Sequence, residues 1–107
     1  MADPIVRIWH GRVSRPKADA YFALMEQVAL PDYRSVPGNL AAYALRRDED
    51  DVTHVLMLTF WESDAAIRAF AGDPVETAKY YDFDAEYLLE YEPTVTHYRL
   101  AHGSQAS

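Results

Sequence analysis

"VTHVLMLTFW", residues 52–61, is a stretch in which both sets of alternating side chains are mostly apolar. One set is His54, Leu56, Leu58 and Phe60, and the other is Val55, Met57, Thr59 and Trp61. Because successive side chains of a strand point to opposite faces, both faces of this strand should be covered. Helices can cover only one of them. We therefore expect a second copy of the chain to cover the other, in a homodimer packed sheet to sheet.

The segments around this strand supply the rest of a sheet. "NLAAYALRR", residues 39–47, is a strand that leads into an acidic turn at 48–51, so residues 40–61 are expected to form a β-hairpin. Residues 5–13 are rich in β-branched and aromatic side chains and predict the first strand. Residues 94–100, "TVTHYRL", predict the last one.

The first connection predicts an amphipathic helix that begins after Ser14 as its cap. Apolar residues recur at three- and four-residue steps and make one stripe: Ala18, Tyr21, Phe22, Met25, Val28 and Ala29. Pro31, Pro37 and Gly38 are expected to end this helix and to form the connection to the hairpin.

The second connection predicts a helix over 62–72, capped by Ser63 and ended by Gly72. A short helix is expected to restart over 73–81, and another turn or two over 84–90.

The resulting order, β-α-β-β-α-β, is the ferredoxin-like arrangement of the α+β class. Right-handed crossovers give an antiparallel sheet in the order 4-1-3-2 with both helices on one face. We expect one domain over 1–107, with its core at about 5–100 and a frayed tail at 101–107.

The composition excludes several classes of function. The net charge is −7, from 17 acidic and 10 basic side chains, which argues against nucleic acid and against an anionic membrane surface. The absence of cysteine excludes disulfides and thiolate chemistry. The first residues do not resemble a signal peptide, and no apolar run approaches about 20 residues, so we expect a cytoplasmic protein.

Residues 80–93, "YYDFDAEYLLEYEP", interleave tyrosines with carboxylates. Phenols beside carboxylates can relay protons, cover a pocket or wrap a small core. The three- and four-residue spacing of Tyr80, Phe83 and Tyr87 favours a covering segment with its rings inward and its carboxylates in solvent. Tyr80 is kept as a candidate functional phenol, which donates a hydrogen bond at neutral pH because a phenol has a pKa near 10.

The histidines show no metal-binding spacing such as HxH or HExxH. His10, His54 and His97 fall near strand ends that a 4-1-3-2 sheet could bring together. We nevertheless expect them to scatter between the two faces, so no metal site and no effect of zinc on the melting temperature are expected.

"FWESDAAIRAFAGDP", residues 60–74, and "VPGNLAAYALRR", residues 36–47, resemble the antibiotic biosynthesis monooxygenase family over about residues 5–100. The resemblance implies a dimeric α+β barrel with a pocket between helices and sheet in each subunit. Members include cofactor-independent oxygenases of polycyclic aromatic phenols and haem-degrading enzymes. Tyr80 stands where the haem-degrading members have a histidine, which implies that this chain does not degrade haem.

The resemblance also implies a set of site residues. Trp61 matches a tryptophan of the cofactor-free oxygenases, and Met57, Ile67 and Tyr80 or Tyr81 stand near their other functional positions. The positions that correspond to the haem-degrading set are Trp9 (or His10), Phe70 and Tyr80. Trp61 and Trp9 can stack on a flat substrate, but they can equally fill a small core.

Two functions are therefore carried forward. The first is oxygenation of an electron-rich aromatic or polyketide-like substrate without a cofactor. In it His10 is the base, Trp61 and Tyr80 are catalytic, and the substrate contacts are Trp9, Met57, Ile67 and Phe70. The second is a non-catalytic dimeric protein that binds an aromatic or apolar ligand.

Overall fold

The structure is a computed structural model that describes residues 3–104. Four antiparallel strands form one sheet: β1 (Ile5–Ser14), β2 (Asn39–Glu49), β3 (Val52–Trp61) and β4 (Thr96–Arg99). Their spatial order is β2-β3-β1-β4, which confirms the predicted ferredoxin-like α+β fold and its 4-1-3-2 sheet. The last residues of the predicted frayed tail, 105–107, lie outside the described residues.

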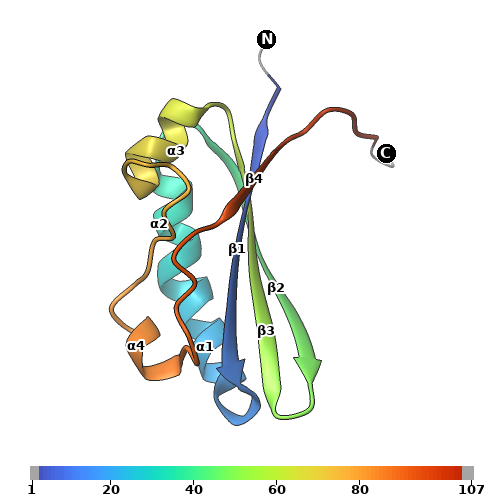
Figure 1. The fold of residues 1–107 in the computed structure, drawn as a ribbon, viewed down its shortest axis with the longest axis vertical. Helices are drawn as coiled ribbons and strands as arrows, with labels where there is room; N and C mark the ends of the chain where they lie inside the picture. Colours follow the sequence, from blue (N-terminus) through green and yellow to red (C-terminus); the bar gives the residue numbers. More distant parts are fainter. Residues whose placement is uncertain (1–2, 105–107) are drawn as a thin grey trace.

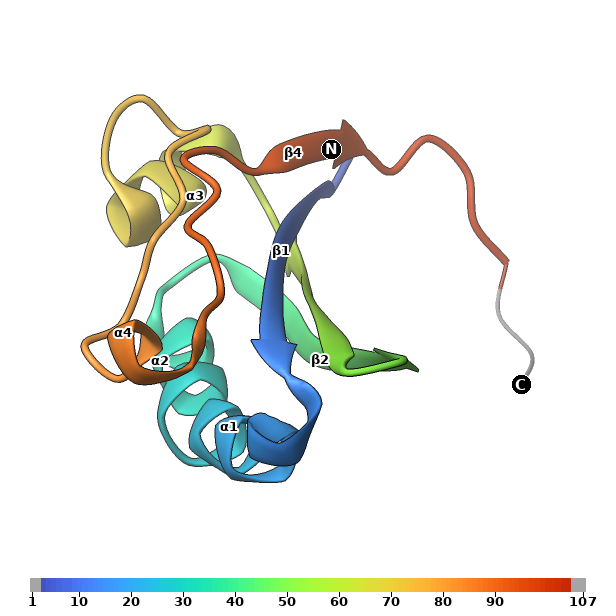
Figure 2. The same ribbon diagram turned by 60° about the horizontal axis from the view of Figure 1, so that its bottom comes forward.

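All the helices lie on one side of this sheet (Figures 1 and 2). They are a 3-10 turn (Arg15–Lys17), α1 (Ala18–Leu24), a π-helical turn (Met25–Ala29), α2 (Leu30–Ser35), α3 (Asp64–Ala71) and α4 (Asp84–Tyr87). We call the side of the sheet that faces them the inner face and the opposite side the outer face. Within residues 3–104, no helix has the length and apolar character needed to cross a membrane.

The first helical segment continues further than predicted. It does not stop before Pro31 but runs through it to Ser35. The π-helical turn precedes the proline, and in it the N–H of Leu30 donates to the carbonyl of Met25, five residues back. This wide turn also shifts the buried stripe. Val28, predicted to face inward, is 41% exposed, whereas Tyr33 one turn later is buried.

The expected short helix over 73–81 does not form. These residues run irregularly on the helical side of the sheet (Figure 1), and Thr77 pairs with Thr94 in an isolated bridge. The buried guanidinium of Arg7 accounts for this path, because it donates to the carbonyls of Val75 and Thr77 at 2.6 and 2.8 Å. In a helix, these carbonyls would face along the axis to their own chain.

The caps of α3 and the hairpin turn, which lie on either side of β3, form where the sequence predicted them. The side-chain oxygen of Ser63 accepts the N–H of Ala66 at 3.2 Å, and Gly72, with a φ of 86°, ends α3. The hairpin turn is tighter than predicted, since β2 extends to Glu49 and only Asp50 and Asp51 lie between the strands. Asp50 takes a positive φ of 54°, which aspartate tolerates in such turns.

One carboxylate of the tyrosine-rich segment is buried, which corrects the prediction that all of them face solvent. Asp84 is 1% exposed. It accepts the hydroxyl of Tyr21 at 2.8 Å and the backbone N–H of Tyr81 at 2.7 Å. Burial raises the pKa of Asp84, and these hydrogen bonds act in the opposite direction. The carboxylate thus ties α4 to α1, and the segment covers the inner face as its ring spacing predicted.

Candidate functional site

The inner face of the sheet carries a cluster of aromatic rings. Trp61, at the end of β3, is fully buried and lies 5.4 Å from Phe70 of α3, between ring centroids. Tyr33 of α2 stacks on Phe70 at 4.5 Å. The indole N–H of Trp61 donates to the Thr59 hydroxyl at 2.9 Å. Met57 and Ile67 are buried in the same core. A flat aromatic molecule would find ring partners here.

Trp9 and Tyr80 form a second part of this cluster, toward the other end of β1. Trp9 is 4% exposed, and its ring meets the Tyr80 ring edge-on at 5.9 Å. Tyr80 also packs on Tyr91 at 4.4 Å, and its hydroxyl donates to the backbone carbonyl of Glu92. Burial, then the charge of Glu92, raises the pKa of Tyr80. Its phenol is therefore a hydrogen-bond donor at neutral pH, as the sequence predicted.

Arg7 places a positive charge beside this cluster of aromatic side chains. Its side chain is 1% exposed. Within residues 3–104, its partners are the carbonyls of Val75 and Thr77 and one nitrogen of His97, so it has no ion pair with a carboxylate. The Nε of Arg7 and the indole Nε1 of Trp9 are buried without a hydrogen-bond partner there. Burial lowers the pKa of Arg7. A buried charge usually has an oppositely charged partner, so this site is suited to an anion.

His97 lies beside Arg7, because the two residues are paired across β1 and β4. Its Nε2 is 3.1 Å from a terminal nitrogen of Arg7. A guanidinium can only donate, so Nε2 accepts and the ring proton is on Nδ1. Burial, then the charge of Arg7, lowers the pKa of His97 below its ordinary 6.5. His97 is therefore a neutral imidazole on the inner face near pH 7.

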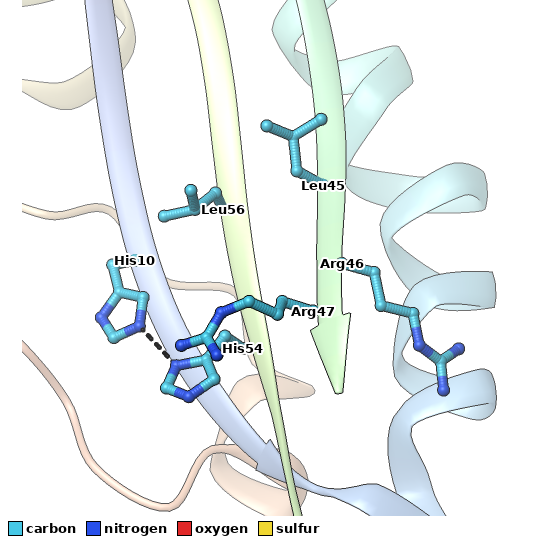
Figure 3. A pocket seen from close by; sticks show the side chains of 6 residues that line it. All are labelled: His10, Leu45, Arg46, Arg47, His54 and Leu56. Atoms are coloured by element: carbon cyan, nitrogen blue, oxygen red, sulfur yellow. Dashed lines mark hydrogen bonds between the residues drawn. The ribbon is translucent and has the colours of Figure 1, made fainter. Parts of the chain in front are cut away.

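His10 lies on the outer face, away from this cluster. Its neighbour there is His54 of β3, and the facing nitrogens, Nε2 of His10 and Nδ1 of His54, are 3.3 Å apart. Together with Leu45 and Leu56 they line a hollow of about 200 Å³ that also touches Arg46 and Arg47 (Figure 3). His10 is therefore separated from Trp61 by the sheet itself.

The structure brings most of the predicted site residues together, but not all of them. The inner face collects six of them: Trp9, Met57, Trp61, Ile67, Phe70 and Tyr80. His10, the predicted base, is on the opposite face, so the predicted base and the predicted stacking residues do not share a site within one chain. The three histidines do not converge on one face, since His97 lies on the inner face, but His10 and His54 lie together on the outer face. The described residues hold no group of three or more metal-ligating side chains.

On the inner face, the sequence analysis did not single out Arg7, and it considered His97 only as a possible metal ligand. A signal for Arg7 was present. It lies two residues before Trp9 on a strand, and side chains two apart share a face. Its pairing with His97 depends on the register between β1 and β4, which only the structure shows.

The chain belongs to the antibiotic biosynthesis monooxygenase family, whose sequence pattern matches residues 4–75. No curated protein sequence matches the chain. Among solved structures, a protein of Nitrosomonas europaea named for the same family superposes with a TM-score of 0.71 at 16% identity, covering 98% of this chain and 97% of that one.

Two further structures share the fold. One is a protein of Mycobacterium tuberculosis, with a TM-score of 0.58 at 20% identity over 97% of this chain and 99% of that one. The other is a monooxygenase of Streptomyces coelicolor in complex with the ligand nanaomycin D. Its TM-score is 0.60 at 20% identity over 99% of this chain and 94% of that one. At these identities, the likeness establishes the fold alone.

Proposed function

We propose that this protein is a cofactor-independent monooxygenase that acts on a flat, electron-rich phenolic or polyketide-like aromatic. The observation that carries the proposal is the buried guanidinium of Arg7, which lies among the aromatic side chains of the inner face and forms no ion pair with a carboxylate among residues 3–104. Membership of a monooxygenase family supports the same reading. In addition, the Streptomyces coelicolor monooxygenase of this fold was crystallised with nanaomycin D.

The chemistry needs an anion, which explains why a buried positive charge matters. Removal of a proton from an acidic CH₂ of an anthrone-type phenol gives a carbanion. This anion supplies the electrons that reduce O₂, and the two combine to a peroxide. Loss of water leaves a carbonyl, so that CH₂ and O₂ give C=O and H₂O. Arg7 would stabilise the developing negative charge, and the buried indole N–H of Trp9 offers a second donor.

The proposed base changes from His10 to His97. His97 is neutral, lies on the inner face and contacts Arg7, so a substrate anion held by Arg7 would be within its reach. In the absence of a substrate, other side chains of the protein already bury Trp61 and Met57 completely. Entry of a substrate therefore requires the covering segment, residues 80–93, to move. Tyr80, which belongs to that segment, would donate a hydrogen bond to a substrate oxygen.

The test is aerobic turnover of an anthrone-type phenol by the purified protein. We expect oxidation to the quinone above the solution rate, with no added metal, flavin or nicotinamide and with no effect of a chelator. Removal of O₂ should stop the reaction. Arg7→Met should raise the KM or lower kcat by at least tenfold, because the anion loses its counter-charge. A wild type that binds no aromatic and turns none over would contradict the proposal.

A second candidate function, a non-catalytic binding protein for an aromatic or apolar ligand, is supported by the position of His10, the predicted base, on the face opposite the aromatic cluster. Trp61, Ile67 and Tyr21 are fully buried, so either function requires the core to open for its ligand. The same experiment separates the two functions. Saturable binding of the aromatic, measured by quenching of tryptophan fluorescence, together with turnover no faster than in buffer, would establish the binding protein.

We also propose a homodimer in which the outer faces of two sheets pack together. The outer face is apolar and unpartnered in one chain. Tyr43 and Leu45 of β2 and Tyr98 of β4 are 54%, 43% and 58% exposed. Small domains often bury such surface in oligomers.

The dimer gives a direct prediction. Sedimentation at micromolar concentration should show twice the mass of the 12.2 kDa chain. Leu58→Glu should yield a folded monomer, since this residue lies on the outer face between Ile8 and Tyr43. Leu89→Glu is the matched control, because Leu89 is 51% exposed but lies outside the sheet, and it should remain dimeric. A monomeric wild type would rule out sheet-to-sheet packing.

A further inference from the structure

The chain that covers the inner face is fixed to β1 at two points, and the residues between these points form a flap, residues 79–87. Before the flap, the guanidinium of Arg7 donates to the carbonyl of Thr77 at 2.8 Å. After the flap, the N–H of Leu89 donates to the carbonyl of Arg12 at 2.9 Å. A segment that is fixed at both ends can open by rotation about those ends while the sheet stays intact.

Asp32 of α2 connects the first part of the flap to the helices. One of its carboxylate oxygens accepts the hydroxyl of Tyr81 at 2.7 Å and lies 3.3 Å from the ammonium of Lys79. Burial, then this hydrogen bond, raises the pKa of Tyr81, so its hydroxyl stays protonated and donates. The side chain of Asp32 is 37% exposed, so water can replace both partners when they leave. We call these three residues the latch.

Asp84 connects the second part of the flap to α1, and α4 lies beside the first helical segment (Figures 1 and 2). Unlike Asp32, Asp84 is buried. It accepts the hydroxyl of Tyr21 and the N–H of Tyr81, and the second of these donors belongs to the flap itself. Asp84 therefore also fixes the internal shape of the flap. Because water reaches Asp32 but not Asp84, we expect opening to begin at the latch.

The latch adjoins the groups that are proposed to hold the substrate. The ammonium of Lys79 lies 4.3 Å from the ring centroid of Phe70, and the guanidinium carbon of Arg7 lies 5.8 Å from the same centroid. Farther along the inner face, the ring of Trp9 is covered by Tyr80 of the flap. Opening of the flap would therefore uncover both parts of the aromatic cluster together with Arg7.

We propose that the flap is a gate to the inner face, that the latch holds it shut, and that a flat aromatic anion enters between the flap and α2. When the latch opens, Lys79 leaves Asp32 and places a positive charge at the entrance, while Arg7 places another farther in. An anion then meets favourable charge along the path. The gate rests on the proposed function only for the nature of the ligand. Its opening is measurable without ligand and without turnover.

The test is hydrogen exchange of the indole N–H of Trp9, followed by NMR after transfer into D₂O. This N–H is buried without a hydrogen-bond partner among residues 3–104, so its protection comes from the groups that cover it. When closing is fast, the exchange rate is proportional to the open fraction. Asp32→Ala should accelerate the exchange at least tenfold. Tyr81→Phe, which keeps the ring and removes only the hydroxyl, should accelerate it at least threefold.

Two controls separate opening of the flap from a loss of global stability. Arg68→Met breaks a surface ion pair of nearly the same length, 3.4 Å to Asp73, outside the flap, and should leave the exchange rate within twofold of the wild type. The indole N–H of Trp61, which is bonded to Thr59, is the internal control. In Asp32→Ala it should accelerate less than the other indole N–H, because it does not contact the flap.

A double variant shows whether the two latch contacts share one carboxylate. In Asp32→Ala, the hydroxyl of Tyr81 has already lost its acceptor. Adding Tyr81→Phe should therefore leave the exchange rate within twofold of Asp32→Ala alone. A further acceleration equal to that of Tyr81→Phe in the wild type would show that the hydroxyl acts independently of Asp32 and would overturn the latch.

Entry of the ligand is the second measurement. The association rate constant of an anthrone-type phenol, followed by stopped-flow tryptophan fluorescence, should rise at least threefold in Asp32→Ala, because only the open form admits it. Unchanged exchange in Asp32→Ala, or equal acceleration of both indoles, would overturn the gate. Faster exchange with unchanged association would reject this entrance. If no aromatic binds to the wild type, the proposed function and the entrance fail, whereas the exchange rates still establish or reject the latch.

Discussion

Replacing Trp61 with alanine is expected to lower the free energy of unfolding by about 3–5 kcal/mol, the usual cost of removing a buried tryptophan. Trp61 is fully buried, and its indole packs against Tyr33 and Phe70 while donating to Thr59. These contacts join the end of β3 to α2 and α3. A domain of this size has a total stability of only about 5–15 kcal/mol, so much of it would be lost. Urea unfolding followed by circular dichroism gives the value.

Trp61→Phe is the companion variant, because phenylalanine keeps a ring between Tyr33 and Phe70. It removes the indole N–H and leaves the Thr59 hydroxyl without that donor, at an expected cost of about 1–3 kcal/mol. If the alanine variant lost less than the phenylalanine variant, the ring contacts would contribute nothing. The interior near Trp61 would then be loosely packed, contrary to the structure.

The sheet could be predicted from sequence because its signals are local and repeat every two residues. β3 buries one alternation fully and half-buries the other, as its apolar pattern indicated. The two ends of α3 could be predicted equally well, because Ser63 and Gly72 each act within one helical turn. The order of the strands in the sheet then followed from the rule that crossover connections are right-handed. Local chemistry and handedness were sufficient here.

The misjudged parts are those in which a distant group decides the local structure. Residues 73–81 have a helical start signal, Asp73-Pro74, yet their carbonyls are bound by Arg7, which is far away in the chain. Asp84 looked like one of several solvated carboxylates, but Tyr21 of α1 provides a buried donor for it. Neither partner can be inferred from spacing along the sequence.

The sequence alone also did not show on which face of the sheet His10 lies. His10 was chosen for its place near the end of β1, and the face was left undetermined. The alternation alone settles the face once one position is known, because Arg7 and Trp9 point inward and His10 must then point outward. His97 was considered only as a metal ligand. Its pairing with Arg7 across the sheet, for which we propose it as the base, is visible only in the structure.

Replacing His97 with glutamine is expected to lower kcat for an anthrone-type phenol by about a hundred- to ten-thousand-fold, the usual contribution of a general base. His10→Gln is the matched control on the outer face and should leave kcat within threefold of the wild type. The reverse order of the two effects would return the base to His10 and would place the substrate on the outer face.

The pH profile gives a readout that a purely structural role of His97 would not move. Burial and the charge of Arg7 lower the pKa of His97, so the acid limb of kcat/KM, which reports the free enzyme, should fall below pH 6.5, the ordinary histidine value, and should disappear from the residual activity of His97→Gln. Stability should follow the same group. Between the lowered folded pKa and the ordinary value, the unfolded chain binds more protons. The free energy of unfolding should therefore decrease as the pH falls through this window. His97→Gln should remove that decrease, because glutamine does not titrate. A wild-type acid limb above pH 6.5 would show that a group other than His97 takes the proton.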